Sequence, residues 1–339
     1  MQCNLCPHRC APPDGGLGFC GSRQRQGDEV VLTTYGLTTG LAVDPIEKKP
    51  LYHFYPGSKV LSFGSIGCNF SCDFCQNFQT AQSRDRSLLR QAASPDDVVR
   101  LAKETGCRSV AFTYNEPIVW AEYVVDVAIA CRKAGIKTVA VSNGFISPER
   151  RSWFFKFIDA ANIDLKSFSD KFYRERCKAA LEPVKETLCY LAKSTKVWLE
   201  VTTLLIPGLN DSDTEVHELS TWLRQNLGAE TPFHLSAFRP MNRLLAISPT
   251  PPRTLFRARE IAMQAGLRYV YTGNINDPAG GTTLCPQCRQ AVIVRNGFNI
   301  MEYAVDEEGC CRFCGQTIPL DNFADCGRIA LDPVFYMGD

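Results

Sequence analysis

Residues 67–77 read GCNFSCDFCQN and directly follow an apolar run, VLSFGSI, at residues 60–66. The run predicts a buried strand, and the loop after it carries Cys68, Cys72 and Cys75 in the spacing C-x3-C-x2-C. Thiolates are the usual ligands of iron–sulfur clusters, and this close spacing lets one loop wrap around a cubane. The sequence therefore predicts a metal centre on the loop that follows the first strand of a larger fold.

The motif has no fourth cysteine, and this separates it from two commoner kinds of metal site. Ferredoxin-type electron carriers give every iron a protein ligand, whereas three ligands leave one iron free to bind a substrate or cofactor. A structural zinc site also needs four ligands, and no further Cys or His lies nearby in the sequence to supply one. Three thiolates therefore favour a catalytic [4Fe-4S] cluster over a zinc site completed from elsewhere in the chain.

The middle of the chain alternates between short strand-like runs and helical segments. Residues 94–97 (SPDD) have the composition of a helix start, and Gly106 follows the expected end of that helix. The strand-like runs lie at residues 60–66, 109–114, 138–142, 162–165, 197–205, 233–237 and 269–272. This alternation indicates a parallel sheet, and six units with a last strand fit a partial (β/α)6 barrel better than a closed eightfold one.

The cysteine distribution divides the chain into parts. Seventeen cysteines without a visible secretory signal favour metal ligation over disulfides. We expect an N-terminal Cys-rich module and connector at residues 1–58, the barrel at 59–275, a zinc-ribbon-like module at 280–326 and a tail at 327–339. The predicted fold class is therefore α/β, a partial (β/α)6 barrel with small Cys-rich metal-binding modules at both termini. The isolated cysteines are expected to be small buried apolar residues, namely Cys107, Cys131, Cys177 and Cys189.

The overall composition excludes some classes of function. Lys and Arg number 37 and Asp and Glu 36, so the basic excess typical of nucleic-acid or anionic-membrane binders is absent. The first thirty residues contain no apolar signal region, and no apolar run approaches the roughly 18–20 residues of a membrane span. We therefore expect a cytoplasmic protein that binds neither nucleic acid nor a membrane.

The stretch at residues 67–77 resembles the signature loop of radical S-adenosylmethionine (SAM) enzymes. Further motifs resemble the branch that includes pyruvate formate-lyase activating enzyme: DPIEKKPLYHFYPGS (44–58), FTYNEP (112–117), VSNG (141–144), NIDLKSF (162–168), LLIPGLND (204–211) and YVYTGN (269–274). Within that branch the chain is similar to the radical SAM protein of the AmmeMemoRadiSam system, named for its association with Memo-like and AMMECR-like domains. The resemblance implies a partial barrel, SAM as cofactor and a [4Fe-4S] cluster held by Cys68, Cys72 and Cys75.

Polar residues of these motifs follow the strands at the end where ligands collect in α/β barrels. Glu116 can accept a hydrogen bond from the amino group of SAM, and Lys166 can pair with its carboxylate. Ribose hydroxyls suit Asp164, Ser142 or Asn143, and the adenine suits Phe74 and Gln76. The expected SAM-binding set is Phe74, Gln76, Asn115, Glu116, Ser142, Asn143, Asp164, Lys166 and His234.

Three positions of this set carry a departure or an alternative. The family's Gly-Gly-Glu-Pro element reads YNEP at residues 114–117, so the glycine pair is lost while the carboxylate of Glu116 is kept. His234 resembles a late-barrel histidine that closes over SAM, and its alternative is a core histidine with satisfied hydrogen bonds. Asp164 and Lys166 point to one side of a strand, where a surface ion pair is the alternative.

The C-terminal part carries two C-x2-C pairs, Cys285 with Cys288 and Cys311 with Cys314, about 22 residues apart. This spacing is typical of a tetrahedral zinc site with a structural role, because so small a module cannot bury enough apolar surface unaided. Mononuclear iron or an auxiliary cluster are the alternatives, and Cys310 and Cys326 are surplus.

The N-terminal cysteines Cys3, Cys6, Cys10 and Cys20 form a more ambiguous set. Zn²⁺ is favoured over an accessory iron–sulfur cluster, and His8 is able to replace one cysteine as a ligand.

The expected function is oxidoreductase-type radical chemistry. A reductant such as flavodoxin or ferredoxin supplies an electron, SAM is cleaved to a 5′-deoxyadenosyl radical, and this radical abstracts hydrogen from an unidentified substrate. Memo-like and AMMECR-like proteins are the expected partners. The alternatives are an activase of a glycyl radical enzyme and a non-catalytic metal-binding electron carrier or scaffold. No catalytic residue is assigned beyond the cluster ligands.

Overall fold

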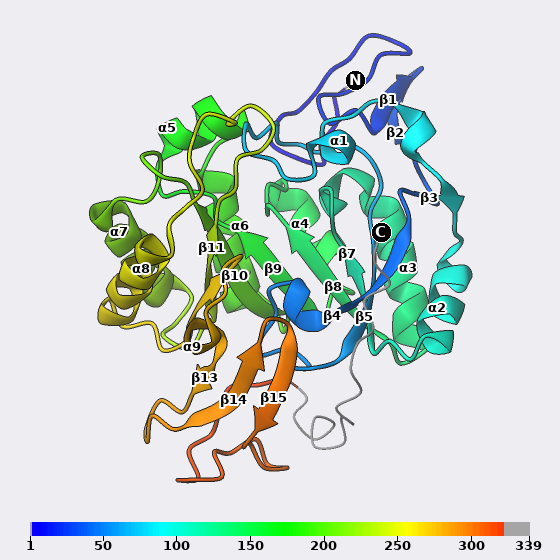
Figure 1. The fold of residues 1–339 in the computed structure, drawn as a ribbon. Helices are drawn as coiled ribbons and strands as arrows, with labels where there is room; N and C mark the ends of the chain where they lie inside the picture. Colours follow the sequence, from blue (N-terminus) through cyan, green and yellow to red (C-terminus); the bar gives the residue numbers. More distant parts are fainter. Residues whose placement is uncertain (1, 322–339) are drawn as a thin grey trace.

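Seven parallel strands and one antiparallel edge strand form the central sheet of the fold (Figure 1), in the order β12-β11-β10-β9-β8-β7-β5-β4. The computed structural model describes residues 2–321; the expected tail, Cys326 and the end of the C-terminal module lie outside the described residues. The strands are β4 (Leu41–Pro45), β5 (Lys59–Phe63), β7 (Ser109–Phe112), β8 (Lys137–Ser142), β9 (Ala160–Asp164), β10 (Trp198–Leu205), β11 (Phe233–Ala237) and β12 (Val270–Gly273). In the described chain β5 and β12 do not pair, so the predicted α/β partial barrel is confirmed.

Six longer helices cover the outside of this sheet (Figure 1). They are α2 (Pro95–Glu104), α3 (Ala121–Lys133), α4 (Pro148–Phe155), α6 (Glu182–Ser194), α7 (Asp213–Asn226) and α8 (Pro252–Gln264). Helix α2 begins where the sequence predicts, because Ser94 and Asp97 form a reciprocal capping box. The short helical segments are α1 (Phe78–Ala81), α5 (Asp170–Phe172), α9 (Pro278–Gly281), the 3-10 segments Ile46–Lys48, Arg86–Leu88 and Pro117–Trp120, and the π-helical segment Tyr173–Cys177.

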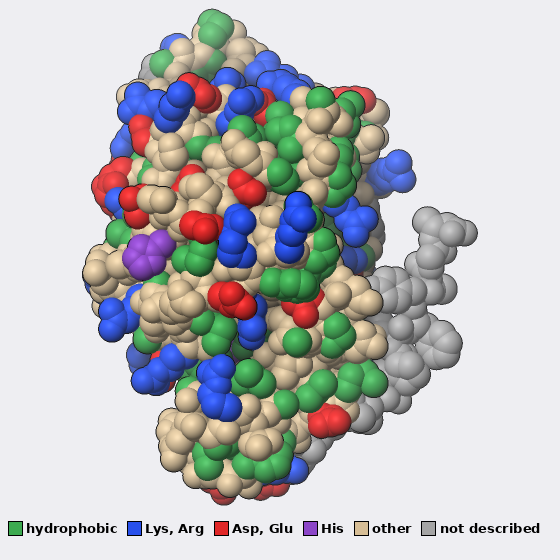
Figure 2. Space-filling model, turned by 60° about the vertical axis from the view of Figure 1, so that its left-hand side comes forward, with side chains coloured by type: hydrophobic (Ala, Val, Ile, Leu, Met, Phe, Trp, Pro, Cys, Tyr) green, Lys and Arg blue, Asp and Glu red, His purple; other side chains and the backbone are tan. Residues whose placement is uncertain are grey.

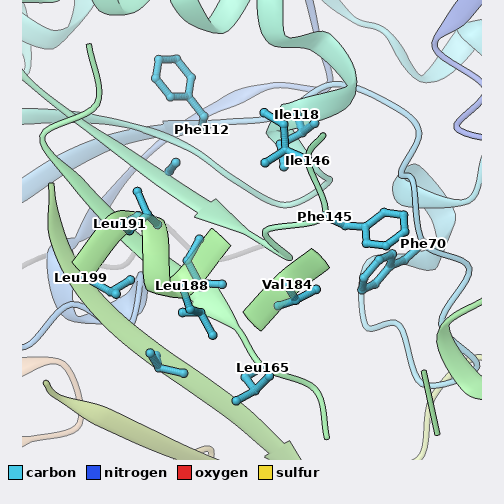
Figure 3. Close-up of a cluster of buried hydrophobic side chains, with 14 of the residues drawn as sticks. Phe70, Phe112, Ile118, Phe145, Ile146, Leu165, Val184, Leu188, Leu191 and Leu199 are labelled. Atoms are coloured by element: carbon cyan, nitrogen blue, oxygen red, sulfur yellow. The ribbon is translucent and has the colours of Figure 1, made fainter. Parts of the chain in front are cut away.

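Apolar side chains from helices and strands fill the space between the two layers (Figure 3). Leu188 and Leu191 of α6 lie near Leu199 of β10 in this core. At its edge the rings of Phe70 and Phe145 lie 5.3 Å apart. Phe70 belongs to the loop with the three-cysteine motif, so this loop is anchored in the core of the barrel.

The connector adds one strand to the central sheet. Residues Leu41–Pro45 form β4, which pairs antiparallel with β5 and adds an edge to the sheet. Pro45 closes this strand at an edge position, where a missing N–H group costs no ladder hydrogen bond.

Small antiparallel sheets lie at both ends of the chain. The N-terminal hairpin comprises β1 (Arg23–Gln26) and β2 (Glu29–Leu32), and the short pair β3 (Leu37–Thr38) and β6 (Gln91–Ala92) follows. The C-terminal module comprises β13 (Thr283–Leu284), β14 (Ala291–Asn296) and β15 (Asn299–Tyr303) around its own small apolar core. Figure 1 shows the N-terminal module beside α1 and the C-terminal module at the other end of the sheet.

The surface and the helices agree with the composition of the chain. Figure 2 shows acidic and basic side chains interspersed over one face of the molecule, without a field of a single sign. None of the helices in residues 2–321 is long and apolar enough to cross a membrane.

Candidate active site

One cavity of about 470 Å³ runs through the barrel and brings the predicted site residues together. Its volume is in the range of small-molecule binding sites. The cavity is lined by all three cysteines of the motif and by every residue expected to bind SAM: Cys68, Cys72, Cys75, Phe74, Gln76, Asn115, Glu116, Ser142, Asn143, Asp164, Lys166 and His234. These residues come from four different strand ends and one interior strand position, so only the folded barrel assembles them.

The cysteine loop is held by backbone hydrogen bonds on one side and by Asn143 on the other. The N–H groups of Ser71 and Asp73 donate to the carbonyl groups of Cys177 and Arg176, both at 2.9 Å. Asn143 donates from Nδ2 to Asn69 Oδ1 at 2.8 Å and to Cys68 Sγ at 3.8 Å. Asn143 therefore supports the loop as well as lining the cavity.

Cys177 is a residue that sequence reasoning misses. It was expected to be an isolated buried cysteine, and it is buried, but burial and the neighbouring thiol of Cys72 of the motif raise its pKa well above the ordinary value. It ends a single π-helical turn, Tyr173–Cys177, a deviation that often occurs at functional sites. The sequence does not reveal where this π-helical turn lies, so the position of Cys177 beside the motif is visible only in the structure.

Glu116 lies at the centre of a hydrogen-bond network below the loop. Its Oε1 accepts from Ser142 Oγ at 2.7 Å and from the N–H of Ile118 at 3.0 Å, and its Oε2 accepts from the N–H of Asn143 at 2.8 Å. Burial raises the pKa of Glu116 to about 7, although these hydrogen bonds act in the other direction. A carboxylate offers about four acceptor positions, so Glu116 retains one for a bound ammonium group.

Asp164 and Lys166 lie side by side at the end of β9. Lys166 Nζ contacts Asp164 Oδ2 at 2.8 Å, and both side chains are largely enclosed. Burial opposes the charge of Lys166, but the Asp164 carboxylate outweighs it, so the pKa of this lysine lies above its usual value. The pair lines the cavity and is therefore not the surface ion pair that the sequence left as an alternative.

Two residues outside the expected set fix the backbone at Lys166. Asn210 Nδ2 donates to the carbonyl of Lys166 at 2.7 Å, and the hydroxyl of Tyr173 accepts from the N–H of Lys166 at 2.9 Å. Asn210 belongs to the LLIPGLND stretch, so that motif positions the lysine from the neighbouring strand.

The YNEP element replaces the family's glycines in two different ways. Tyr114 keeps a backbone conformation suited to glycine, with φ of 71°, and its hydroxyl donates to Asp44 Oδ2 at 2.8 Å. Lys49 lies over its ring, 4.7 Å from the centroid. Asn115 uses its whole amide on the backbone at residues 65–67, which leads into the cysteine loop. Both replacements therefore hold the entrance to the cluster loop.

His234 lies inside the barrel and contacts Glu200 of β10, a residue outside the expected set. The distance from His234 Nε2 to Glu200 Oε2 is 2.6 Å. Burial raises the pKa of Glu200, but the hydrogen bond and charge of His234 outweigh it, so that pKa lies below its ordinary value. Glu200 also accepts from the N–H groups of Tyr52 and His53 at 3.0 and 2.8 Å. The pair thereby ties the connector to the barrel floor while His234 lines the cavity.

The C-terminal cysteines converge closely, as a single metal ion requires. The sulfur atoms of Cys285, Cys288, Cys311 and Cys314 all lie within 4.8 Å of one another. The Cys285–Cys314 and Cys288–Cys311 sulfur distances are 3.6 and 3.7 Å. Cys310 contacts Thr317 and the Glu308 carbonyl instead.

The cavity residues fit both groups that the resemblance implies. The donor set of three thiolates on one loop suits an iron–sulfur cluster with one free iron. Glu116 and Lys166 present opposite charges to a zwitterionic amino acid such as the methionine part of SAM. Thr202 Oγ1 is buried at the cavity wall without a hydrogen-bond partner among the described residues, which leaves it free for a ligand hydroxyl.

Comparisons with known proteins agree with this geometry. Residues 64–219 match the radical SAM superfamily, and an uncharacterised protein of Methanocaldococcus jannaschii is 39% identical over 94% of this chain and 95% of its own length. The chain belongs to the radical SAM superfamily. It is thus a radical SAM enzyme, and its fold implies a [4Fe-4S] cluster and SAM as cofactors.

Two further proteins that this radical SAM enzyme resembles have more specific names. Pyruvate formate-lyase 1-activating enzyme of Escherichia coli K12 is 26% identical over 64% of this chain and 93% of its own length. A radical SAM methyltransferase from Sphaerobacter thermophilus shares the fold with a TM-score of 0.50 and 16% identity, over 65% of this chain and 67% of that one. The second likeness shows the fold alone.

Proposed function

We propose that this radical SAM enzyme cleaves SAM reductively at a cluster held by Cys68, Cys72 and Cys75 and uses the radical on a hydrogen donor bound in the same cavity. The single observation that carries the proposal is the cavity itself. It joins three thiolates to a carboxylate, Glu116, and an ammonium group, Lys166, that together match the charges of an amino acid.

The side chains of the enzyme bind and orient SAM. Glu116 accepts from the amino group at its remaining acceptor position, and Lys166 turns from Asp164 toward the carboxylate of SAM. Asp164 and Thr202 are then available to the ribose hydroxyls. When bound, the cluster supplies one electron to the sulfonium of SAM, which breaks the C5′–S bond and gives methionine and a 5′-deoxyadenosyl radical. The enclosing barrel keeps water from that radical.

The part of the cavity formed by the connector and the C-terminal hairpin is where we place the substrate. It is bounded by the connector residues Glu47 and Tyr52 and by Phe298 of the C-terminal hairpin. Arg295 holds this hairpin in place, because it donates to the carbonyl of Tyr52 at 2.6 Å and lies 3.6 Å from Glu47. A compact donor or one extended peptide loop fits a chamber of about 470 Å³. We assign the enzyme to the AmmeMemoRadiSam context on its motifs, with Memo-like and AMMECR-like proteins as partners.

A second candidate function is activation of a glycyl radical enzyme. The similarity to pyruvate formate-lyase 1-activating enzyme over most of that protein favours it. Genes for Memo-like and AMMECR-like proteins next to this gene would support the first candidate. A neighbouring glycyl radical enzyme that develops a glycyl radical EPR signal in the presence of this protein, SAM and a reductant would support the second.

We further propose a one-electron donor of the flavodoxin or ferredoxin class, a cytoplasmic location, and Zn²⁺ at the four C-terminal cysteines. Their sulfur distances support zinc, because four Zn–S bonds of about 2.3 Å in a tetrahedron place the sulfurs a little under 4 Å apart.

Metal and SAM counts test the proposal. The anaerobically reconstituted protein should bind about one SAM per chain, and Cys68→Ala/Cys72→Ala/Cys75→Ala should lose about four irons and this binding. A matched control, Cys107→Ala/Cys131→Ala/Cys189→Ala, removes as many cysteines and should keep both. Equal iron and SAM contents in the two triple variants would contradict the proposal.

A further inference from the structure

The four N-terminal cysteines surround a second, smaller cavity of their own. Cys3, Cys6, Cys10 and Cys20 all line it, together with His8 and apolar side chains. His8 also lines it, with Nε2 2.7 Å from the carbonyl oxygen of Asn69 and its ring packed on Phe19. Four thiolates therefore face one enclosed space.

The chain contains two internal standards for the size of the group that this space fits. The C-terminal cysteines, spaced for one ion, bring all their sulfur atoms within 4.8 Å. The motif cysteines of the barrel, spaced for a cubane, do not converge in this way, and within residues 2–321 neither do the N-terminal four. A cubane places several atoms between its thiolates, whereas a mononuclear site places one. The N-terminal sulfur atoms are therefore spread more widely than those of the C-terminal site, which favours a group larger than one ion.

A buried cation accompanies this cavity. Arg23 lines it and is almost fully buried, and its Nη1 donates to Glu122 Oε2 at 2.8 Å. Four thiolates on a [4Fe-4S] core carry a net negative charge, and Arg23, whose own charge is shared with Glu122, is a cation on the wall of this cavity.

The N-terminal cavity lies directly against the loop that carries the barrel cluster ligands. A Cβ atom added to Gly67 would lie only 2.2 Å from the carbonyl oxygen of Cys20, so these two backbones touch. Ser22 Oγ donates to the carbonyl of Ile66 at 2.6 Å. Gly67 precedes Cys68, and Asn69, the partner of His8, follows it. Cys20 of the N-terminal set and Cys68 of the barrel set are therefore connected through a single backbone contact, that between Cys20 and Gly67.

We propose that Cys3, Cys6, Cys10 and Cys20 hold an accessory [4Fe-4S] cluster that relays electrons to the cluster of the barrel. The relay rests on the proposed function, whereas the accessory site does not. One electron leaves a flavodoxin- or ferredoxin-class donor and reduces the accessory cluster from the 2+ to the 1+ state. It then passes to the barrel cluster, and the accessory cluster returns to 2+. Four protein ligands leave the accessory cluster no open iron, which suits electron transfer rather than SAM binding.

Metal analysis tests the accessory site without any activity. The reconstituted full chain should hold about eight irons, and Cys6→Ser/Cys20→Ser should lose about four of them. In the variant without the three barrel ligands, about four irons should remain, with an EPR signal after reduction that does not change on addition of SAM. This second variant decides the matter even if the first one fails to fold. A barrel-ligand variant without iron, or loss of about one zinc from the N-terminal variant, would overturn the site.

The choice of reductant tests the relay. With reduced flavodoxin, SAM cleavage by Cys6→Ser/Cys20→Ser should fall about tenfold or more, because the path to the barrel cluster is interrupted. With dithionite, a small molecule that reaches the barrel cluster from its own cavity, the rate should stay within about twofold. Unchanged cleavage with flavodoxin would refute the relay, while cleavage lost with both reductants would show that the N-terminal module serves the barrel fold alone.

Discussion

At the scale of single residues, the site combines features that the sequence shows with features that only the fold supplies. The three motif cysteines, Glu116 and Lys166 are recognisable from their motifs. The raised pKa of Glu116 is not, since it depends on burial by residues far away in the sequence. Similarly, the letters YNEP show that glycines are lost but not that Tyr114 keeps the backbone angle of a glycine. The hydroxyl of Tyr114 is held by Asp44, seventy positions away.

The pKa of Glu116 predicts how SAM affinity depends on pH. Because burial raises that pKa to about 7, the carboxylate that pairs with the ammonium group of SAM is lost as the pH falls below this value. The dissociation constant should therefore rise on going from about pH 8 to about pH 6, at most tenfold per pH unit. Glu116→Gln should bind SAM weakly at both pH values. Affinities of the native protein that do not change over this range would contradict the assignment.

Removing the charge of Lys166 should also weaken SAM binding. Lys166→Met removes a charge-assisted hydrogen bond to the SAM carboxylate, worth roughly 1.5–3 kcal/mol, or about tenfold to over a hundredfold in affinity. The absorbance of the cluster should not change. Lys171→Met is the control, since that lysine is exposed and its side chain is paired with Glu175 at the surface. Equal dissociation constants for the two variants would place Lys166 outside the SAM site.

At the scale of elements, the chain order of strands and helices follows from sequence, whereas the way the connector docks does not. Alternating runs and caps such as Ser94 locate the barrel elements to within a few residues. The edge strand β4 was not expected, because its pairing with β5 is not encoded in its own short segment. The Glu200–His234 pair likewise appears only when β10 and β11 lie side by side and the connector crosses them.

Glu200 provides a test of how the connector is attached. Glu200→Ala leaves the N–H groups of Tyr52 and His53 and the ring of His234 without a buried acceptor, so it should destabilise the protein by about 3–5 kcal/mol. Glu218→Ala on the exposed face of α7 should cost less than about 0.5 kcal/mol. The midpoint of urea unfolding measures both. Similar midpoints for the two variants would show that Glu200 does not hold the connector.

The C-terminal module should depend on its metal, and the barrel should not. Cys285→Ser/Cys288→Ser removes two ligands of the proposed zinc and should release about one zinc per chain, because no four-thiolate site remains. Hydrogen exchange should become faster in β14 and β15, whereas the iron content should be unchanged. A loss of about four irons instead would mean that these cysteines carry a cluster.

At the scale of the whole molecule, one cysteine set lines the barrel cavity, a second lines a smaller cavity beside the cluster loop, and a third lies in the C-terminal module. The barrel and its catalytic cysteines are predictable, because local periodicity and a compact motif encode them. The contact of the N-terminal module with Gly67 and the closure of the cavity by Phe298 are not, because they join segments tens to hundreds of positions apart. The sequence also identifies metal-binding cysteines, but it does not give the sulfur–sulfur distances that distinguish a site for a single ion from a site for a cluster.

The central claim is that the three motif cysteines support cleavage of SAM, and product analysis after anaerobic reduction with dithionite tests it most directly. The native protein and the Cys107→Ala/Cys131→Ala/Cys189→Ala control should form methionine and 5′-deoxyadenosine in equal amounts, and Cys68→Ala/Cys72→Ala/Cys75→Ala should form neither. Formation of 5′-deoxyadenosine by the variant without the motif cysteines would contradict the account.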